Sequence, residues 1–254
     1  MMEATILNSR GKDMLCLIEY KDPSVRGKRV VLYKHGFCGN KIAPHRMMAN
    51  LGHQLAEEGY TVIRFDCVGA GDSEGDWSDM TISGEIQDLK LVLHWIRREL
   101  CPEKLMVIGY SMGGLETAVC CREVPLDGIL FWSPVSQAVD CFRHLLGEER
   151  FAAGMGGQNV DFCGDRVGKE FFQDLESPAL DGLAAIRGFE RPVFLIHGSA
   201  DTDVLPENSR RYMDVLPGAE RHLVEGAGHG YDGWALQDEL WKWSKEYIHR
   251  IMNR

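Results

Sequence analysis

The sequence has 254 residues, of which 44% are hydrophobic and 26% are charged, as in an ordinary globular protein. A chain of this length buries enough surface to fold without disulfides or metals. Its 28 basic and 38 acidic residues give a formal net charge of −10. This charge argues against nucleic acid and anionic membranes as partners, because both bind basic surfaces. No run of about 18 apolar residues is present, so we also expect no membrane span.

The start of the chain has neither the basic nor the apolar region of a secretory signal. The eight cysteines include no Cys-x-x-Cys pair, and several lie in apolar runs such as residues 14–18. We therefore expect reduced thiols in a cytoplasmic protein.

Strands and helices are predicted to alternate along the chain. Short apolar runs indicate strands, and longer stretches with apolar residues every three or four positions indicate helices. The predicted strands are 3–9, 14–20, 30–33, 60–65, 104–109, 128–132, 192–197 and 221–224, of which the first two form a hairpin. The predicted helices are 44–58, 81–100, 112–123, 206–215 and 233–252. This alternation is typical of an α/β fold, in which a mostly parallel sheet has helices on both faces.

Residues 134–190 break this alternation and contain several glycines and phenylalanines. A stretch of this length between two sheet strands is typical of an inserted lid or cap. We therefore expect one domain over residues 1–254 with a lid inserted at 134–190. Three glycines, Gly154, Gly156 and Gly157, would let part of this lid move. An exposed apolar lid would also let two copies of the chain pair as a homodimer.

The candidate nucleophile is Ser111, in a Gly-x-Ser-x-Gly motif that spans Gly109 to Gly113. The motif lies between a predicted strand and a predicted helix, which is the context of a nucleophile elbow. Its glycines avoid contacts around the tight turn. The dipole of the following helix favours negative charge beside the serine.

A serine hydroxyl is a weak nucleophile near neutral pH, so it needs a base, and the base needs an orienting acid. His229 follows the last predicted strand in a glycine-rich loop, and Asp201 follows the strand at 192–197. Asp203, two residues further along, is the alternative acid. Because open parallel sheets gather their sites at the carboxyl ends of the strands, we expect Ser111, Asp201 and His229 to lie together.

Acyl chemistry at a serine also needs hydrogen-bond donors for a tetrahedral oxyanion. We assign this role to the backbone N–H of Met112, directly after the serine, and that of Phe37, in the loop after the strand at 30–33. The loop 65–75 contains Gly-x-Gly, but its spacing does not fit dinucleotide binding, so we interpret it as a scaffold loop under the nucleophile. The sequence shows neither metal-ligand spacing nor a P-loop, and we expect no cofactor and no metal.

Five motifs together resemble those of the α/β-hydrolase superfamily and, more narrowly, of the feruloyl (cinnamoyl) esterase branch of small bacterial serine esterases. These motifs lie at residues 35–41, 65–75, 109–114, 197–201 and 225–229. The resemblance implies an α/β-hydrolase fold with Ser111 as nucleophile, His229 as base and Asp201 as acid. It also implies Phe37 and Met112 as oxyanion donors, and it places the aromatic acyl group of a substrate under the lid.

Four lid residues are candidates for binding that group, namely Phe171, Phe172, Asp161 and Asp165. The two phenylalanines would line the substrate pocket or, alternatively, pack the lid onto the sheet. The two aspartates would accept a hydrogen bond from a phenolic substrate or, alternatively, be solvated loop residues.

The leading hypothesis is a carboxylic ester hydrolase that acts on a small-molecule ester through an acyl-enzyme on Ser111. Hydroxycinnamoyl esters are one expected substrate class. The alternative enzyme is an acyltransferase or a peptidase-like hydrolase with the same three residues. Outside enzymes, the alternative is a binding module without catalysis.

Overall fold

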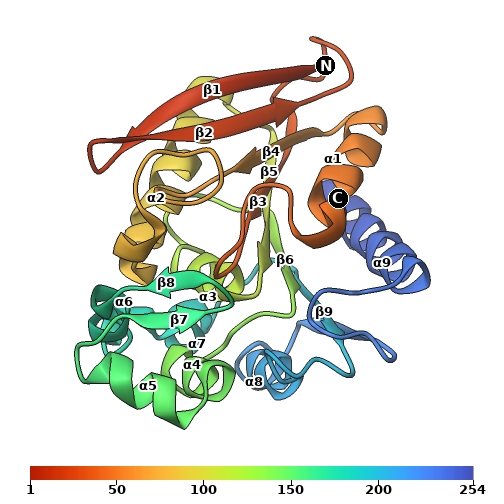
Figure 1. The fold of residues 1–254 in the computed structure, drawn as a ribbon. Helices are drawn as coiled ribbons and strands as arrows, with labels where there is room; N and C mark the ends of the chain where they lie inside the picture. Colours follow the sequence, from red (N-terminus) through yellow and green to blue (C-terminus); the bar gives the residue numbers. More distant parts are fainter. Residues whose placement is uncertain (254) are drawn as a thin grey trace.

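The main sheet has eight strands in the order β1-β2-β4-β3-β5-β6-β9-β10 in the computed structural model, which describes residues 1–253 (Figure 1). The strands are β1 (Met2–Ser9), β2 (Lys12–Glu19), β3 (Arg29–Lys34), β4 (Thr61–Phe65), β5 (Lys104–Tyr110), β6 (Gly128–Trp132), β9 (Val193–Gly198) and β10 (Glu220–Val224). The predicted hairpin β1–β2 is antiparallel, and β2 also runs antiparallel to β4. All other neighbours are parallel, which confirms the predicted mostly parallel sheet.

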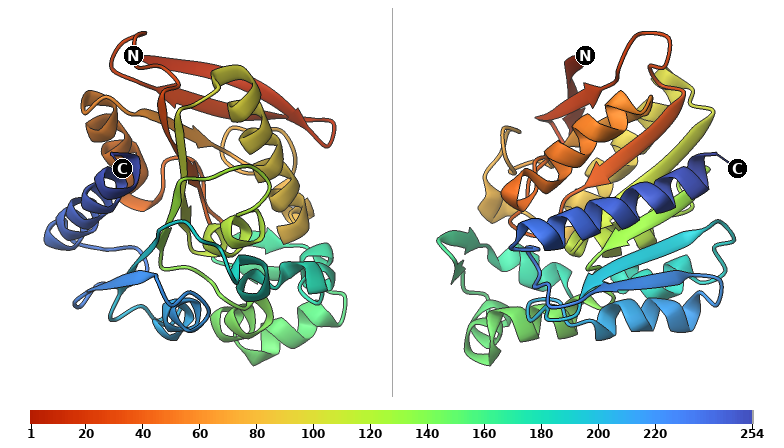
Figure 2. Two further views of the ribbon diagram at one scale, coloured as in Figure 1. Left: turned by 180° about the vertical axis from the view of Figure 1, so that it is seen from behind. Right: turned by 90° about the vertical axis from the view of Figure 1, so that its right-hand side faces the viewer.

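Helices cover both faces of this sheet. On one face, α1 (Met47–Glu57) and α9 (Trp234–Met252) lie side by side (Figure 2). The opposite face carries α2 (Ile82–Trp95), α3 (Met112–Val119) and α8 (Glu207–Val215). Strand β3 shows why both faces are covered, because its apolar side chains alternate: Val30 and Leu32 join the α2–α3 core. Val31 and Tyr33 join the α1–α9 core.

The segment between β6 and β9 folds into several short elements. They are α4 (Ala138–Leu146), α5 (Glu148–Met155), β7 (Val160–Phe162), β8 (Asp165–Val167), α6 (Lys169–Asp174), η4 (Pro178–Leu180) and α7 (Gly182–Ile186). Figure 1 shows them, in green to cyan, grouped below α2 and α3. They contact α2, α3, α8 and the short turn η2 (Trp77–Asp79). Within residues 1–253, no helix combines the length and apolar character needed to cross a membrane.

The start of the predicted helix 44–58 differs from the structure. Regular α-helix begins only at Met47, after a 3₁₀ turn η1 (Pro44–Arg46). Ala43, His45 and Arg46 have positive φ angles of 64°, 52° and 60°. This left-handed backbone breaks the helical hydrogen-bond ladder, so the loop before α1 is longer than its sequence suggests.

Two other predicted helices are shorter than expected. The helix predicted over 81–100 ends as α-helix at Trp95 and continues as a π-helical turn, η3 (Ile96–Leu100). It stops where Cys101 turns to φ 46° ahead of Pro102, since a proline disfavours helical backbone in the residue before it. The helix predicted over 112–123 ends at Val119 and is followed by turns.

Candidate active site

The turn between β5 and α3 carries Ser111 at the carboxyl end of the sheet. Ser111 has φ 58° and ψ −124°, a strained conformation for a residue with a side chain. Its surroundings admit only glycine at two positions. A Cβ on Gly36 would lie 2.7 Å from the Ser111 Cβ, and one on Gly113 would lie 2.3 Å from the His35 carbonyl oxygen. The glycines therefore allow the backbone to close tightly around the serine.

The three residues predicted as nucleophile, base and acid lie together. Ser111 Oγ is 3.0 Å from His229 Nε2, and His229 Nδ1 is 2.7 Å from Asp201 Oδ2. They follow β5, β10 and β9, whose carboxyl ends meet at one edge of the sheet. Asp203, the alternative acid, is exposed, and its backbone N–H donates to Asp201 Oδ1 at 3.0 Å. The structure therefore places Asp201 rather than Asp203 beside the imidazole.

Asp201 is buried among hydrogen-bond donors. Its Oδ1 accepts from the backbone N–H groups of Asp203 and Val204, at 3.0 and 2.9 Å. Its Oδ2 faces His229 and lies 3.4 Å from His197 Nε2. Burial alone would raise the pKa of Asp201, but the hydrogen bonds from His197 and His229 outweigh it and hold the pKa below its usual value. The ionised carboxylate thus accepts a hydrogen bond from the Nδ1–H group of His229, which leaves Nε2 to face the serine.

Tyr110 holds the loop that carries His229. Its ring stacks on the imidazole with centroids 5.1 Å apart, and its hydroxyl donates to the His229 carbonyl oxygen at 2.8 Å. Because Tyr110 directly precedes Ser111, the end of β5 positions both Ser111 and His229. Sequence reasoning missed this residue, although an aromatic side chain inside the Gly-x-Ser-x-Gly motif was a visible signal.

One predicted oxyanion donor, Met112, follows Ser111 in the sequence. The other, Phe37, belongs to the loop after β3, which packs against Ser111. Met112 is the first residue of α3, so its N–H belongs to the group that finds no partner inside the helix. Phe37 follows Gly36, which packs directly against Ser111. Both N–H groups therefore lie in backbone next to the serine, and their role as oxyanion donors stays a prediction.

Two lid candidates, Phe171 and Phe172, are fully buried. The ring of Phe171 lies 5.2 Å from that of Phe37 and 4.8 Å from that of Phe142. The ring of Phe172 fills the space beside Gly154, where a Cβ would lie 2.3 Å from it. Neither phenylalanine lines the cavity at Ser111, so the structure favours their packing role. It also makes Gly154 a packing position, while movement of the insert stays a prediction.

The other two candidates, Asp161 and Asp165, are exposed residues of the β7–β8 hairpin. Asp161 is opposite Arg166 in this hairpin and matches the solvated alternative. Asp165 lies near Cys38 of the loop after β3. Burial raises the pKa of the Cys38 thiol most, and the Asp165 carboxylate raises it further. The hairpin therefore reaches the loop that carries Phe37.

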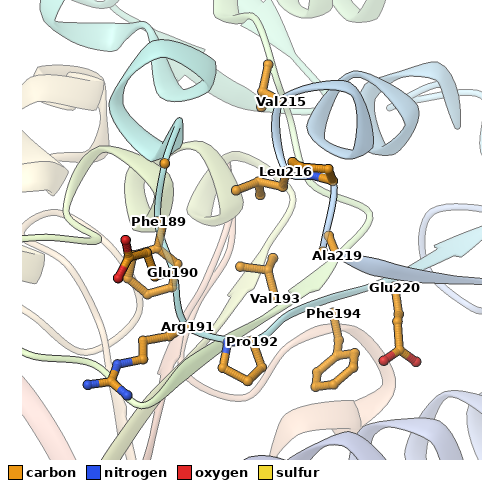
Figure 3. A pocket seen from close by; sticks show the side chains of 13 residues that line it. Phe189, Glu190, Arg191, Pro192, Val193, Phe194, Val215, Leu216, Ala219 and Glu220 are labelled. Atoms are coloured by element: carbon orange, nitrogen blue, oxygen red, sulfur yellow. The ribbon is translucent and has the colours of Figure 1, made fainter.

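A cavity of about 260 Å³ opens beside Ser111 and His229. Its other lining residues are Tyr33, Gly36, Phe37, Cys38, Gly39, Asn40, Ala43, Pro44 and Tyr110. A larger hollow of about 640 Å³ lies between residues 188–194 and 215–220 (Figure 3). That hollow is at the amino ends of β9 and β10, the opposite edge of the sheet from Ser111. The smaller cavity is therefore the candidate active site.

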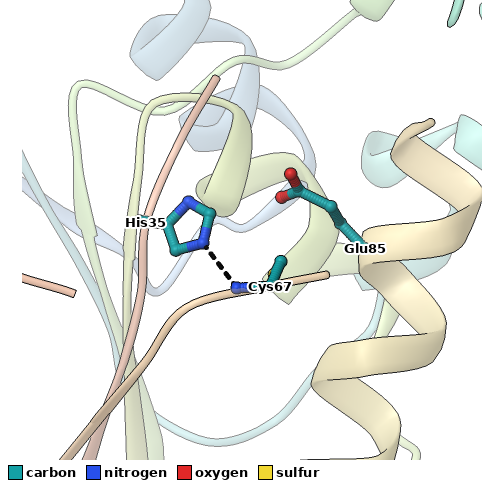
Figure 4. Close-up of side chains that lie close together, drawn as sticks. All are labelled: His35, Cys67 and Glu85. Atoms are coloured by element: carbon teal, nitrogen blue, oxygen red, sulfur yellow. Dashed lines mark hydrogen bonds between the residues drawn. The ribbon is translucent and has the colours of Figure 1, made fainter. Parts of the chain in front are cut away.

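A separate buried cluster of His35, Cys67 and Glu85 offers three potential metal ligands within 4.8 Å of one another (Figure 4). However, the Cys67 N–H donates to His35 Nε2 at 3.1 Å and occupies that nitrogen. Lys34 Nζ is 2.6 Å from Glu85 Oε2 and supplies a positive charge there. The arrangement is that of a buried ion pair with its hydrogen bonds, and it does not fit a metal.

Comparisons with known proteins agree on the fold. A family model described as the α/β-hydrolase fold matches residues 29–125. Est1E from Butyrivibrio proteoclasticus, in a structure with bound ferulic acid, has a TM-score of 0.85 at 19% identity and covers 99% of this chain and 100% of its own. The chain belongs to the α/β-hydrolase superfamily. The esterase domain of a Rhodothermus marinus protein has the same fold, with a TM-score of 0.75 at 18% identity and 99% coverage of both chains.

Relatives of this α/β-hydrolase are also found by sequence. The lysophosphatidylserine lipase of Danio rerio is 34% identical over 201 residues, which are 73% of this chain and 47% of the relative. The lipase of the same name from Mus musculus is 32% identical over 132 residues, which are 50% of this chain and 31% of the relative. The chain thus spans about half, or less, of the length of these relatives. The superfamily and fold predicted from the motifs are confirmed.

Proposed function

We propose that this α/β-hydrolase is a serine hydrolase of carboxylic esters. The observation that carries the proposal is the hydrogen-bonded chain from Ser111 through His229 to the buried Asp201 carboxylate. Such a chain activates a serine for attack on an acyl carbon. The names of the sequence relatives, which are lipases, and of the Rhodothermus marinus esterase domain support ester chemistry.

Acylation follows from this geometry. Ser111 Oγ attacks the ester carbonyl carbon while His229 Nε2 accepts the serine proton. The carbonyl oxygen becomes an oxyanion that accepts hydrogen bonds from the N–H groups of Phe37 and Met112. The C–O bond to the alcohol then breaks, and His229 returns the proton to the leaving oxygen. Asp201 fixes the imidazole tautomer and stabilises the imidazolium during both transfers.

Deacylation repeats these steps with water. A water molecule gives a proton to His229 Nε2 and attacks the acyl carbon of the ester formed on Ser111. The second tetrahedral intermediate collapses, the acid leaves, and Ser111 Oγ recovers its proton from His229. Ser111 and the water molecule supply the protons that His229 transfers, so the proposed reaction balances without a cofactor.

Two substrate classes are consistent with the proposal. The motif resemblance and the position of Phe37 in the cavity wall suggest hydroxycinnamoyl esters as one class. Monoacyl lipids follow from the names of the sequence relatives. A panel of methyl ferulate, a lysophospholipid and p-nitrophenyl esters of rising chain length separates the two by kcat/KM.

The decisive experiment replaces Ser111 by alanine. We expect Ser111→Ala to lose roughly 10³-fold or more in kcat on p-nitrophenyl acetate and to resist labelling by a fluorophosphonate. Ser133→Ala is the matched control, since Ser133 is a buried serine whose Oγ bonds the Tyr231 hydroxyl at 3.2 Å, away from His229. Wild-type turnover by Ser111→Ala would contradict the proposal. An acyltransferase would instead show faster ester consumption when an alcohol or thiol acceptor is added.

A further inference from the structure

Tyr33 of β3 has a buried hydroxyl to which no protein group in residues 1–253 hydrogen-bonds. Buried polar groups are nearly always paired, because an unpaired one loses its hydrogen bonds to water without replacement. Other buried tyrosines follow this rule: the hydroxyls of Tyr110 and Tyr212 donate to backbone carbonyl oxygens at 2.8 Å. Tyr33 differs from them, and it lines the cavity beside Ser111.

The rest of the cavity wall offers neutral hydrogen-bonding groups. Asn40 uses its side-chain oxygen to accept from the Ile42 N–H at 3.0 Å, which leaves its amide N–H₂ as a donor. Lys41, the next residue, brings no free charge because its Nζ is 2.5 Å from Asp66 Oδ2 and also contacts Asp72. A cavity of this kind suits a neutral acceptor oxygen better than a carboxylate or a phosphate.

The backbone of the same wall is strained. Cys38 and Ala43 line the cavity, and both have positive φ angles, of 51° and 64°. Residues with a side chain adopt this conformation only where the surrounding structure holds them there, and such residues gather at ligand sites. The loop between β3 and α1 is thus fixed in the shape that forms part of the cavity wall.

We propose that this cavity is a subsite for a neutral, oxygen-bearing group of the ester, and that the Tyr33 hydroxyl donates a hydrogen bond to that oxygen. The proposal rests on ester hydrolysis at Ser111, because the cavity contains Ser111 and His229. It narrows the substrate class to esters with a hydroxyl, ether or carbonyl oxygen near the scissile bond. A purely aliphatic group of the same size would leave the Tyr33 hydroxyl unpaired and would bind less well.

The test compares Tyr33→Phe with the wild type on two pairs of isosteric esters. The acyl pair is p-nitrophenyl methoxyacetate and p-nitrophenyl butyrate, and the alcohol pair is 2-methoxyethyl acetate and butyl acetate. In the pair whose variable group occupies the cavity, we expect Tyr33→Phe to lower kcat/KM for the ether-bearing ester about five- to tenfold, mainly through KM. The alkyl ester should keep or gain rate, because it no longer covers an unpaired hydroxyl.

Stability distinguishes this role from a structural one. Because the Tyr33 hydroxyl has no partner, the free Tyr33→Phe protein should melt at the wild-type temperature or above it. Tyr60→Phe is the matched control, since Tyr60 is buried in the same core but does not line the cavity. It should leave the rate ratio of each ester pair unchanged.

Several results would overturn the proposal. A clear fall in Tm or a failure of Tyr33→Phe to fold would show that the hydroxyl is structural. Equal rate changes for both members of both pairs would show that it does not select an oxygen. A wild-type protein that resists fluorophosphonate labelling and hydrolyses none of the four esters would contradict the ester hydrolase itself, and the subsite with it.

Discussion

Asp201 and Asp203 are two residues apart, yet only Asp201 contacts His229. Asp201→Asn keeps an oxygen for the N–H groups of Asp203 and Val204 but presents an N–H₂ group to His229 Nδ1. The imidazole must then turn its lone pair towards this amide and its proton towards the serine. We expect kcat on p-nitrophenyl acetate to fall roughly 10³-fold or more. The matched variant Asp203→Asn should remain close to wild type, and a large loss there would contradict the assignment of the acid.

The lowered pKa of Asp201 also predicts how stability depends on pH. A carboxyl group whose pKa in the folded state lies below its ordinary 3.8 contributes stability above that value and loses it as the pH falls towards the folded-state pKa. The excess stability of the wild type over Asp201→Asn should therefore be larger at pH 7 than at pH 3. Urea unfolding of both proteins at the two pH values measures this difference. A difference that is the same at both would contradict the lowered pKa.

Three elements meet at a buried group of charges near the nucleophile turn. Lys34 of β3 lies 2.6 Å from Glu85 of α2 and 2.7 Å from Glu116 of α3. Burial raises the pKa of Glu116 well above its usual value, and Lys34 opposes this only in part. Burial would also raise the pKa of Glu85, but Lys34 holds it below its usual value. Of the two glutamates, Glu85 thus favours the charged form and Glu116 the neutral form beside the Lys34 cation.

This assignment predicts strong coupling between the two glutamates. Glu116→Gln replaces a neutral acid by a neutral amide and should cost less than about 1 kcal/mol of unfolding free energy. Glu85→Gln should cost little more, because Glu116 ionises in its place. The double variant leaves Lys34 buried without a counter-charge and should lose about 3–5 kcal/mol. Urea unfolding of all four proteins measures the coupling, and a double variant whose loss equals the sum of the two single losses would contradict it.

The arrangement of elements explains what the sequence could and could not predict. Ser111, Asp201 and His229 were predictable because each follows its own strand, and parallel strands bring their carboxyl ends together. The ion pair between Lys34 and Glu85 was not, because it joins residues 51 positions apart on a strand and a helix. Its formation depends on the register and rotation of both elements, which periodicity leaves undefined.

The insert at 134–190 shows the same limit. Its phenylalanines were visible in the sequence, but its short helices and the direction of each side chain were not. Phe171 and Phe172 proved to fill the interior of the insert, and the cavity instead takes its wall from the loop after β3. Strain in that loop, as at Ala43, is set by tertiary contacts and has no signal in the local sequence.

At the scale of the whole molecule, the burial of the insert's phenylalanines decides whether they are available for a contact between two copies of the chain. Phe142, Phe151, Phe171 and Phe172 are each at most 2% exposed. The apolar side chains that suggested a homodimer are therefore covered within one chain. The homodimer stays a prediction, and sedimentation at several concentrations would test it.

The net charge of −10 predicts that long-range electrostatic attraction raises kcat/KM for cationic esters over neutral ones. A negative protein attracts cations over roughly one Debye length, about 30 Å at 0.01 M salt and about 8 Å at physiological ionic strength. Butyrylcholine and 3,3-dimethylbutyl butyrate have nearly the same shape and differ by one positive charge. We expect kcat/KM for butyrylcholine to fall about two- to fivefold between 10 and 200 mM salt, because screening removes the attraction. The neutral ester should show no such dependence and controls for salt effects on the enzyme. A rise for butyrylcholine would mean that local positive charge near the cavity outweighs the field of the whole chain.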